Sequence, residues 1–149
     1  NKTDLGLQAK ALMDKGELVP DQVVIGMIGH QISSNKDAKG FIFDGFPRTV
    51  AQAEALDSLL KEFSTEIHEM IALEVEEAEL KSRLLERGKV SGRPDDQDIS
   101  KIENRIQVYK NQTLPVAEYY QSQSKYKGIN GIGTIEEIFA RICSAIEAA

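Results

Sequence analysis

The sequence predicts an α/β protein in which an open parallel sheet carries helices on both faces. Two short apolar runs, at residues 40–44 and 70–75, have the length and composition of strands buried on both faces, and residues 126–130 are expected to form a third strand. Segments with helical periodicity or helix-start signals separate these runs. Alternation of this kind indicates parallel strands joined by right-handed crossovers. Ligands of such sheets bind beyond the carboxyl ends of the strands, so the residues after each strand are the candidate site residues.

Two helices are expected before the first strand. The first spans Asp4–Asp14 and stops at Gly16. Pro20 stands at the favoured first-turn position of the second helix. The apolar stripe of that second helix consists of Val23, Val24, Met27, Ile28 and Ile32.

Each of the first two strands is followed by a helix. Thr49 is expected to cap a helix that runs through Lys61. The run at 70–75 leads into a helix over residues 77–86 that ends at Gly88.

The last third of the chain supplies one long helix, one strand and one amphipathic helix. After the polar stretch at residues 89–98, a helix runs to about residue 123 and bends or slackens at Pro115. The third strand follows, and residues 134–148 form the closing helix.

Composition indicates a soluble globular protein with a single domain over residues 1–149. Apolar residues make up 41% of the chain and charged residues 28%. The net charge of −6 argues against a nucleic-acid partner, and no apolar run approaches the roughly 20 residues of a membrane span. The single cysteine, Cys143, leaves no internal disulfide, so we expect a cytoplasmic protein.

A first polar cluster follows the strand at residues 40–44. Asp44 ends that strand, where an acid can hold a metal-bound water. Gly45 allows a ligand to approach the backbone, and Arg48 offers a planar fork suited to phosphate. Gln52 lies one helical turn further on, where its amide can pair with the edge of a base. The alternative for this segment is an ordinary strand–turn–helix connection with a solvated arginine.

A second polar cluster follows the helix after the second strand. Arg87 and Arg93 flank a glycine-bearing loop, and Arg105 lies on the next helix. Three guanidinium groups at one place would neutralise a triphosphate and the charge of a phosphoryl group in transfer. Asp95 and Asp96 could balance these arginines by forming ion pairs. The alternative is a solvated charged loop.

Taken together, the motifs resemble those of adenylate kinases in order and spacing, over essentially the whole chain. The resemblance implies a P-loop NTPase-like fold and transfer of the γ-phosphoryl group of Mg-ATP to AMP, giving two ADP. Thr49 stands where UMP/CMP kinases carry an asparagine, which favours AMP as the acceptor. The motifs are Gly16–Pro20, Asp44–Thr49 with Gln52, Arg87–Gly88 and Ser91–Asp96.

The resemblance also implies roles for individual residues, within an AMP-binding region that includes residues 1–35 and a short lid loop at 88–98. Asp44 orders magnesium-bound water, with no direct protein ligand to the metal. The AMP-binding residues are Leu18, Val19, Gly45, Arg48 and Gln52. The ATP-binding residues are Arg87, Arg93, Gly131, Ile132 and Gly133, the last three forming the backbone segment against the adenine. The catalytic residues are Arg48, Arg87, Arg93, Arg105 and Asp44.

One motif of the family is missing from these 149 residues. They contain no Gly-x-x-x-x-Gly-Lys loop, which in this family follows an N-terminal strand at the centre of the sheet. We therefore expect a truncated kinase that lacks this strand and loop, and that is a monomer when complete. Two alternatives to an AMP kinase are a UMP/CMP kinase and a noncatalytic nucleotide-binding module.

Overall fold

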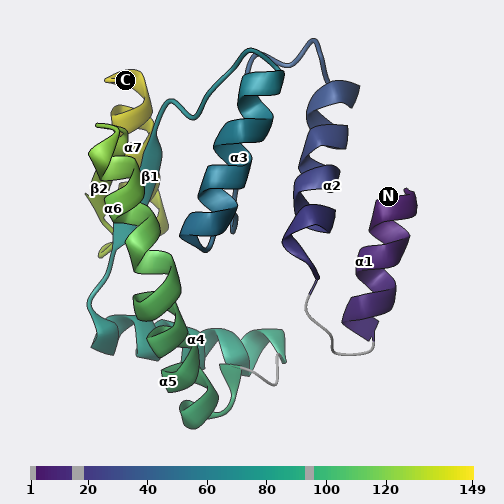
Figure 1. Cartoon of the computed structure of the whole chain (residues 1–149). Coiled ribbons are helices and arrows are strands. Elements are labelled where there is room, and N and C mark those ends of the chain that lie inside the picture. Colours follow the sequence, from purple (N-terminus) through teal and green to yellow (C-terminus); the bar gives the residue numbers. More distant parts are fainter. Residues whose placement is uncertain (1–2, 15–18, 93–95) are drawn as a thin grey trace. The chain divides into compact units, whose positions relative to one another are not determined.

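The computed structural model describes residues 3–14, 19–92 and 96–149 (Figure 1). Contacts divide the chain into two compact units. One consists of Asn1–Pro47 and Ala51–Glu66, and the other of Arg48–Val50 and Ile67–Ala149. The single-domain organisation stays a prediction.

The first unit is built from helices. α1 (Asp4–Asp14) has the predicted bounds. α2 (Asp21–Ser34) begins directly after Pro20, which was expected inside the first turn but has a ψ of 145° and precedes the helix. The two helices pack closely at Gly26, where an added Cβ would lie 3.0 Å from a methyl carbon of Leu5. α3 (Val50–Glu62) begins directly after Thr49, as expected, and buries Ala53, Leu56 and Leu60.

The predicted strand at residues 40–44 is not formed. This segment makes no strand ladder, and the side chain of Ile42 is 91% exposed. An apolar run becomes a strand only where a neighbouring strand completes its hydrogen bonds. Among the described residues, the sheet consists of two strands, and neither of them pairs with this segment. The prediction was therefore wrong for this element.

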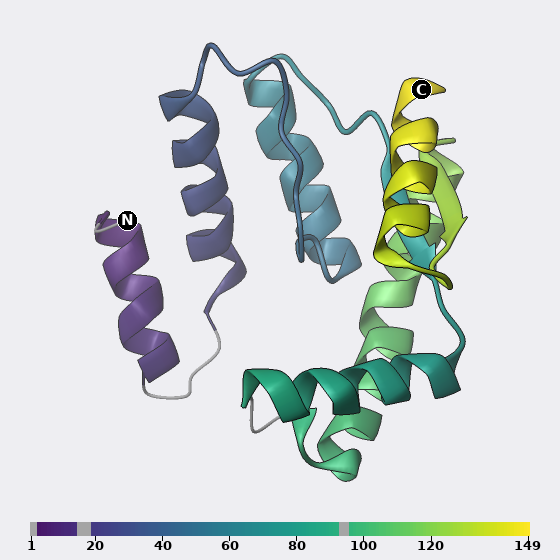
Figure 2. The same cartoon turned by 180° about the vertical axis from the view of Figure 1, so that it is seen from behind.

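The second unit contains the sheet. β1 (Met70–Glu74) and β2 (Tyr126–Asn130) pair in parallel, with Met70 opposite Tyr126 and Glu74 opposite Asn130. α6 (Leu114–Ser122) and α7 (Ile135–Glu147) cover opposite faces of this pair (Figures 1 and 2). The predicted α/β class, with parallel strands and helices on both faces, is confirmed.

The first two helices of the connection between β1 and β2 pack against each other. α4 (Glu77–Ser91) runs past Gly88, where it was expected to end, and stops at Gly92, whose φ of 66° is left-handed. The first residues of the predicted lid loop are therefore helical. α5 (Ile99–Val108) follows and contacts α4.

The predicted long helix is interrupted before Pro115. The π-helical segment η2 (Tyr109–Thr113) separates α5 from α6, and Pro115 lies in the first turn of α6. Proline has no N–H and crowds the preceding turn, so a widened turn at this place has a local cause. The expected slackening is confirmed and lies just upstream of the proline.

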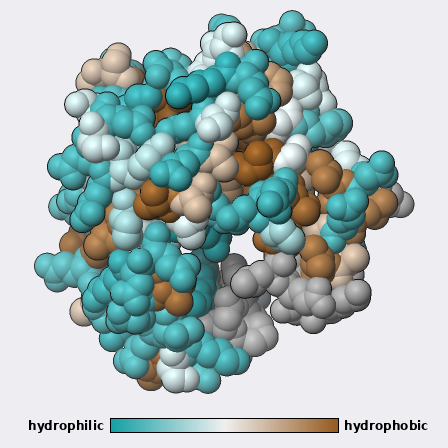
Figure 3. Space-filling view, viewed as in Figure 1, coloured by the Kyte–Doolittle hydropathy of each residue, from teal (hydrophilic) through white to brown (hydrophobic). Residues whose placement is uncertain are grey.

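The buried core is small, and hydrophobic side chains also reach the surface. Figure 3 shows brown hydrophobic patches among the mostly hydrophilic atoms of the visible face. No helix in residues 3–14, 19–92 and 96–149 has the length and apolar character needed to cross a membrane. The buried residues of the second unit are Gly88, Asp96, Ile102, Ile106, Val116, Tyr120, Ile129 and Gly131.

Candidate functional site

Two of the three arginines of the second polar cluster, Arg87 and Arg105, meet on one buried carboxylate. Arg87 of α4 donates from Nε and Nη2 to the two carboxylate oxygens of Asp96, at 2.6 and 3.0 Å. Arg105 of α5 donates from Nη1 to Asp96 Oδ1 at 2.6 Å. The Asp96 side chain has no exposed surface, whereas those of Arg87 and Arg105 are 46% and 41% exposed. The carboxylate therefore fixes two guanidinium groups that still face solvent.

Sequence features at the start of α5 hold Arg105 in this arrangement. Asp98 caps the helix, since its carboxylate accepts hydrogen bonds from the hydroxyl and the backbone N–H of Ser100. The hydroxyl bond, followed by the backbone bond, lowers the pKa of Asp98 below its ordinary value. Ile102 and Ile106 anchor the opposite side of α5 in the core. Arg105 is thus carried by a helix that is both capped and packed.

Gly88 allows the chain at Asp96 to lie against α4. A Cβ at position 88 would overlap the backbone carbonyl group of Asp96, at 2.8 Å from its carbon. In addition, the side-chain amide of Gln97 donates to Gly88 O at 3.3 Å. The close approach of backbone to backbone explains why a residue without a side chain stands in the middle of this helix.

We predict that Gly88→Ala lowers the free energy of unfolding by about 1–3 kcal/mol, because the backbone of one segment must shift to accept the methyl group. Chemical denaturation of the two proteins measures this loss. Gly40→Ala is the matched control, because nothing lies within 4 Å of the position of its Cβ. Equal effects of the two substitutions would contradict the packing role of Gly88.

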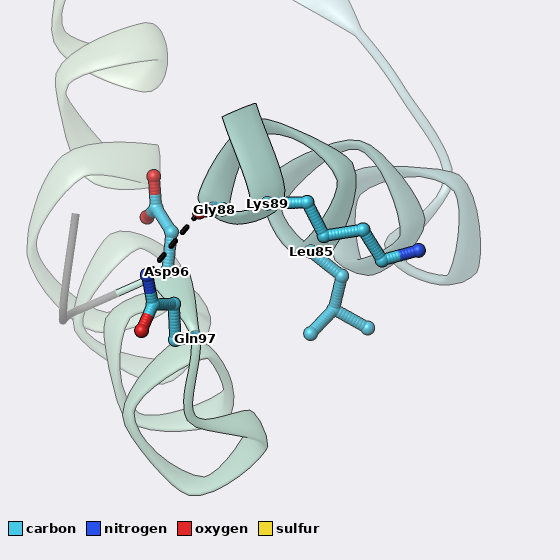
Figure 4. Close-up of a pocket in the computed structure, with 5 residues that line it drawn as sticks. All are labelled: Leu85, Gly88, Lys89, Asp96 and Gln97. Atoms are coloured by element: carbon cyan, nitrogen blue, oxygen red, sulfur yellow. Dashed lines mark hydrogen bonds between the residues drawn. The ribbon is translucent and has the colours of Figure 1, made fainter. Parts of the chain in front are cut away.

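A pocket of about 290 Å³ lies beside this cluster. Figure 4 shows Asp96 and Gln97 facing α4 across it, with the ammonium group of Lys89 pointing away. The other lining residues are Leu85 and Gly88. The pocket is formed where α4 meets the segment that precedes α5.

The predicted adenine-contacting segment, Gly131–Gly133, lies in the loop at residues 130–133 that links β2 to α7. Gly131 donates its N–H to Glu74 O at 2.9 Å, which continues the parallel ladder beyond β2. A Cβ on Gly131 would lie 2.5 Å from a methyl carbon of Val75, so a side chain does not fit there. Arg83 of α4 donates from Nη1 to Gly131 O at 2.8 Å. The loop is therefore held from the β1 side and from α4.

The other end of the loop is fixed by the start of α7. Thr134 and Glu137 form a reciprocal capping box, in which each side chain accepts from the backbone N–H of the other residue. Arg141, two turns into α7, donates from Nη1 to Asn130 O at 2.8 Å and to Ile132 O at 2.6 Å. The backbone of this loop is thus bonded on both sides of its glycines.

Of the predicted AMP-binding residues, Gln52 forms a side-chain hydrogen bond to another helix. Gln52, on α3, donates from Nε2 to Asp21 Oδ1 at 2.8 Å, and Asp21 is the first residue of α2. Val19 is partly buried directly before α2. Gly45 has a φ of 76°, which favours glycine. Leu18 lies outside the described residues.

The remaining predicted residues lie on either side of a cis Phe46–Pro47 peptide bond. Asp44 is exposed in a bend. Arg48 is exposed, and its backbone carbonyl accepts a hydrogen bond from Thr113 Oγ1 at 2.9 Å. Thr113 belongs to the π-helical segment, so the irregular turn before Pro115 anchors the backbone of Arg48.

The structure brings together Arg87 and Arg105, as the sequence predicted, while Arg93 lies outside the described residues. The sequence did not single out Arg83, Arg141 or Asp21. The four-residue spacing of Arg83 and Arg87 places both on one face of α4 and is a signal that could have found the first. Arg141 and Asp21 carry no comparable signal, because their partners lie outside the helices that carry them.

Comparison with known proteins identifies the family. The adenylate kinase family model matches residues 1–125. An adenylate kinase of Flavobacterium psychrophilum is 52% identical over 146 residues, which are 98% of this chain and 77% of that protein. An adenylate kinase of Bacteroides fragilis is 49% identical over 99% of this chain and 77% of that protein. An adenylate kinase of Maricaulis maris is 44% identical over 97% of this chain and 77% of that protein.

The chain belongs to the adenylate kinase family. The predicted family, the P-loop NTPase-like α/β fold and the enzyme class, a nucleoside monophosphate kinase, are confirmed by this membership. The chain spans about three quarters of the length of these relatives, 77% in each case. The roles of individual residues stay predictions.

Proposed function

We propose that this adenylate kinase transfers the γ-phosphoryl group of Mg-ATP to AMP by positioning both nucleotides and neutralising their charge. The observation that carries the proposal is the buried Asp96 carboxylate, which fixes the partly exposed guanidinium groups of Arg87 and Arg105. Within an enzyme of this family, such a pair is suited to a transferring phosphoryl group. ATP, AMP and ADP are the proposed substrates and products.

The transfer itself needs no covalent bond to the protein. An oxygen of the AMP phosphate attacks the γ-phosphorus in line, and the bond from that phosphorus to the β-phosphate oxygen breaks. One ADP forms from AMP and the other is left from ATP. Arg48 binds the acceptor phosphate, while Arg87, Arg93 and Arg105 bind the ATP phosphates and the group in transfer. Their fixed positive charges stabilise the negative charge that spreads over the phosphoryl oxygens.

Magnesium enters this scheme as part of Mg-ATP. Mg²⁺ usually keeps several waters and binds one or two carboxylates together with substrate phosphates. In the described residues, no group of three or more His, Cys, Asp and Glu side chains is placed to hold a metal ion. An isolated, exposed carboxylate such as Asp44 fits a contact to magnesium-bound water. The metal supplies further charge neutralisation at the β- and γ-phosphates.

Acceptor recognition is assigned to Gln52 and its partner Asp21. A carboxylate only accepts hydrogen bonds, so Asp21 directs the NH₂ group of the Gln52 amide toward itself. The amide oxygen is thereby oriented as well, and it suits the exocyclic amino group of adenine. This orientation supports AMP over UMP, which carries a carbonyl oxygen in place of an amino group at the corresponding edge.

The test of the proposed function is ADP formation from Mg-ATP, measured with AMP, CMP and UMP as separate acceptors. We expect turnover with AMP to exceed turnover with CMP or UMP. Gln52→Ala should raise KM for AMP by about tenfold, because a hydrogen bond to the base is lost, and should leave KM for ATP within twofold. Equal rises for both nucleotides would contradict the assignment of Gln52.

Two further variants sharpen this test. Gln22→Ala, on the exposed side of α2, removes the same type of side chain and should leave both KM values unchanged. Asp21→Asn should also raise KM for AMP, as Gln52→Ala does, since an asparagine no longer fixes the orientation of the Gln52 amide.

The alternative function is a noncatalytic nucleotide-binding module. Binding of AMP without phosphoryl transfer to any acceptor, in the protein as its gene encodes it, would favour that alternative.

A further inference from the structure

The loop at residues 130–133 contains two glycines, yet its backbone is bonded at successive positions. Free glycine-rich backbone samples many conformations, and fixing it costs conformational entropy. Here the carbonyl oxygens of Asn130, Gly131 and Ile132 each accept a hydrogen bond from an arginine. Three consecutive carbonyl groups are thus held by side chains rather than by other backbone groups.

The two arginines reach the loop from different helices. Arg83 comes from α4 and bonds Gly131 O, while its Nε also donates to Glu79 at 2.7 Å. Arg141 comes from α7 and uses one nitrogen, Nη1, for both Asn130 O at 2.8 Å and Ile132 O at 2.6 Å. Because one nitrogen bridges two carbonyl groups on either side of Gly131, Arg141 fixes the curvature of the loop.

Among the described residues, Arg141 forms no ion pair, and its hydrogen bonds go to these two carbonyl groups. Hydrogen bonds from a charged donor are stronger than those between neutral groups. The described hydrogen bonds of the Arg141 guanidinium group therefore all go to the loop.

We propose that Arg141 is a positioning residue that sets the selectivity of this adenylate kinase for the base of the phosphoryl donor. The inference rests on the proposed function and on the role that the family resemblance implies for residues 131–133, which are expected to lie against the adenine of ATP. A loop that contacts a base through its backbone can distinguish bases only if its N–H and C=O groups stay in fixed positions. Adenine and guanine present opposite donor and acceptor patterns at their six-position, so a displaced loop loses the distinction.

The experiment compares ATP and GTP as phosphoryl donors at saturating AMP, in the protein as its gene encodes it. Arg141→Met removes both hydrogen bonds and keeps much of the apolar stem. We expect KM for ATP to rise about tenfold and KM for GTP to change less than twofold, while KM for AMP, measured separately at saturating ATP, stays unchanged. Arg141→Lys keeps a charged donor and should recover part of the preference for ATP.

Two controls separate positioning from general loss of structure. Ser144→Ala lies on the exposed part of the same helix, and Lys61→Met removes an equal charge from α3; both should leave the ATP/GTP preference unchanged. Thermal unfolding of each variant reports stability independently of the KM values. A merely structural role for Arg141 would lower the melting temperature and would raise the KM values for ATP and GTP equally.

The outcomes distinguish the inference from the proposed function. If Arg141→Met leaves KM for ATP unchanged, or raises KM for ATP and GTP in parallel, the positioning role of Arg141 is wrong while AMP-dependent ADP formation still supports the proposed function. If the unsubstituted protein forms no ADP from Mg-ATP and AMP, the proposed function fails first, and the inference fails with it.

Discussion

Replacing Arg87 by alanine is expected to lower kcat by about 1,000-fold, in line with the known contribution of an arginine at a transferring phosphoryl group. Arg87 is held by two hydrogen bonds to Asp96, and 46% of its side-chain surface remains open to solvent. The lost interaction is strongest in the transition state, when negative charge spreads over the phosphoryl oxygens. Steady-state ADP formation at saturating ATP and AMP measures the effect on kcat.

Two further variants separate the effect of the Arg87 guanidinium group on kcat from the effect of removing a positive charge. Arg87→Lys keeps the positive charge but loses the planar fork, and should recover about tenfold at most. Lys101→Ala removes a cation from the exposed side of the neighbouring α5 and should change kcat less than twofold. A loss below tenfold for Arg87→Ala would show that Arg87 does not act on the group in transfer.

Replacing Asp96 by asparagine is expected to affect both stability and catalysis. The side chain of Asp96 is fully buried and bonds Arg87 and Arg105 together. Removing one partner of a fully buried ion pair costs about 3–5 kcal/mol. Because both arginines here are partly exposed and can be rehydrated, we expect a smaller loss, of about 1–3 kcal/mol, in the free energy of unfolding.

The catalytic effect of Asp96→Asn comes from displaced arginines. A shift of about 1 Å in a positioning group can cost about 100-fold in rate, and we expect a fall in kcat of that size. If Asp96 acts through its partners, the combined Asp96→Asn and Arg105→Ala variant should lose less than the product of the single effects. Independent, multiplicative effects in this cycle would overturn the positioning role. Asp37→Asn, an exposed acid outside the cluster, is the control for loss of charge.

Much of the local structure was predictable because its causes lie within a few residues. The start of α2 after Pro20, the strands at 70–74 and 126–130, and the start of α3 after Thr49 follow from turn residues and short-range periodicity. The capping box of α7 is likewise a local signal, with Thr134 and Glu137 three residues apart. The signals for these elements lie in residues that are close together in the sequence, so they can be read without knowing the tertiary structure.

The errors arise where structure depends on distant partners. Residues 40–44 have the composition of a buried strand, but a strand requires a hydrogen-bonding neighbour, and among the described residues none pairs with them. Gly88 was predicted to end the helix that begins at Glu77, because glycine commonly follows the last helical residue. Its role became visible only from the Asp96 backbone packed against it, and α4 continues through it to Ser91.

The candidate site shows the same difference between local features, which the sequence predicts, and contacts between separate segments, which it does not. The sequence by itself determined the family, most of the helices, two of the strands and the residue types that suit phosphates and bases, because these signals occupy short continuous segments. The sequence suggested ion pairs of Asp95 and Asp96 with the arginines, but only the tertiary structure decided that Asp96 joins Arg87 to Arg105. The contact of Asp21 with Gln52 and those of Arg141 with the loop at residues 130–133 came from the tertiary structure alone. The residues in these contacts are separated by 9 positions for Arg87 and Asp96, 31 for Gln52 and Asp21, and 11 for Arg141 and Asn130. The directions of their side chains depend on how the helices and loops that carry them pack against one another.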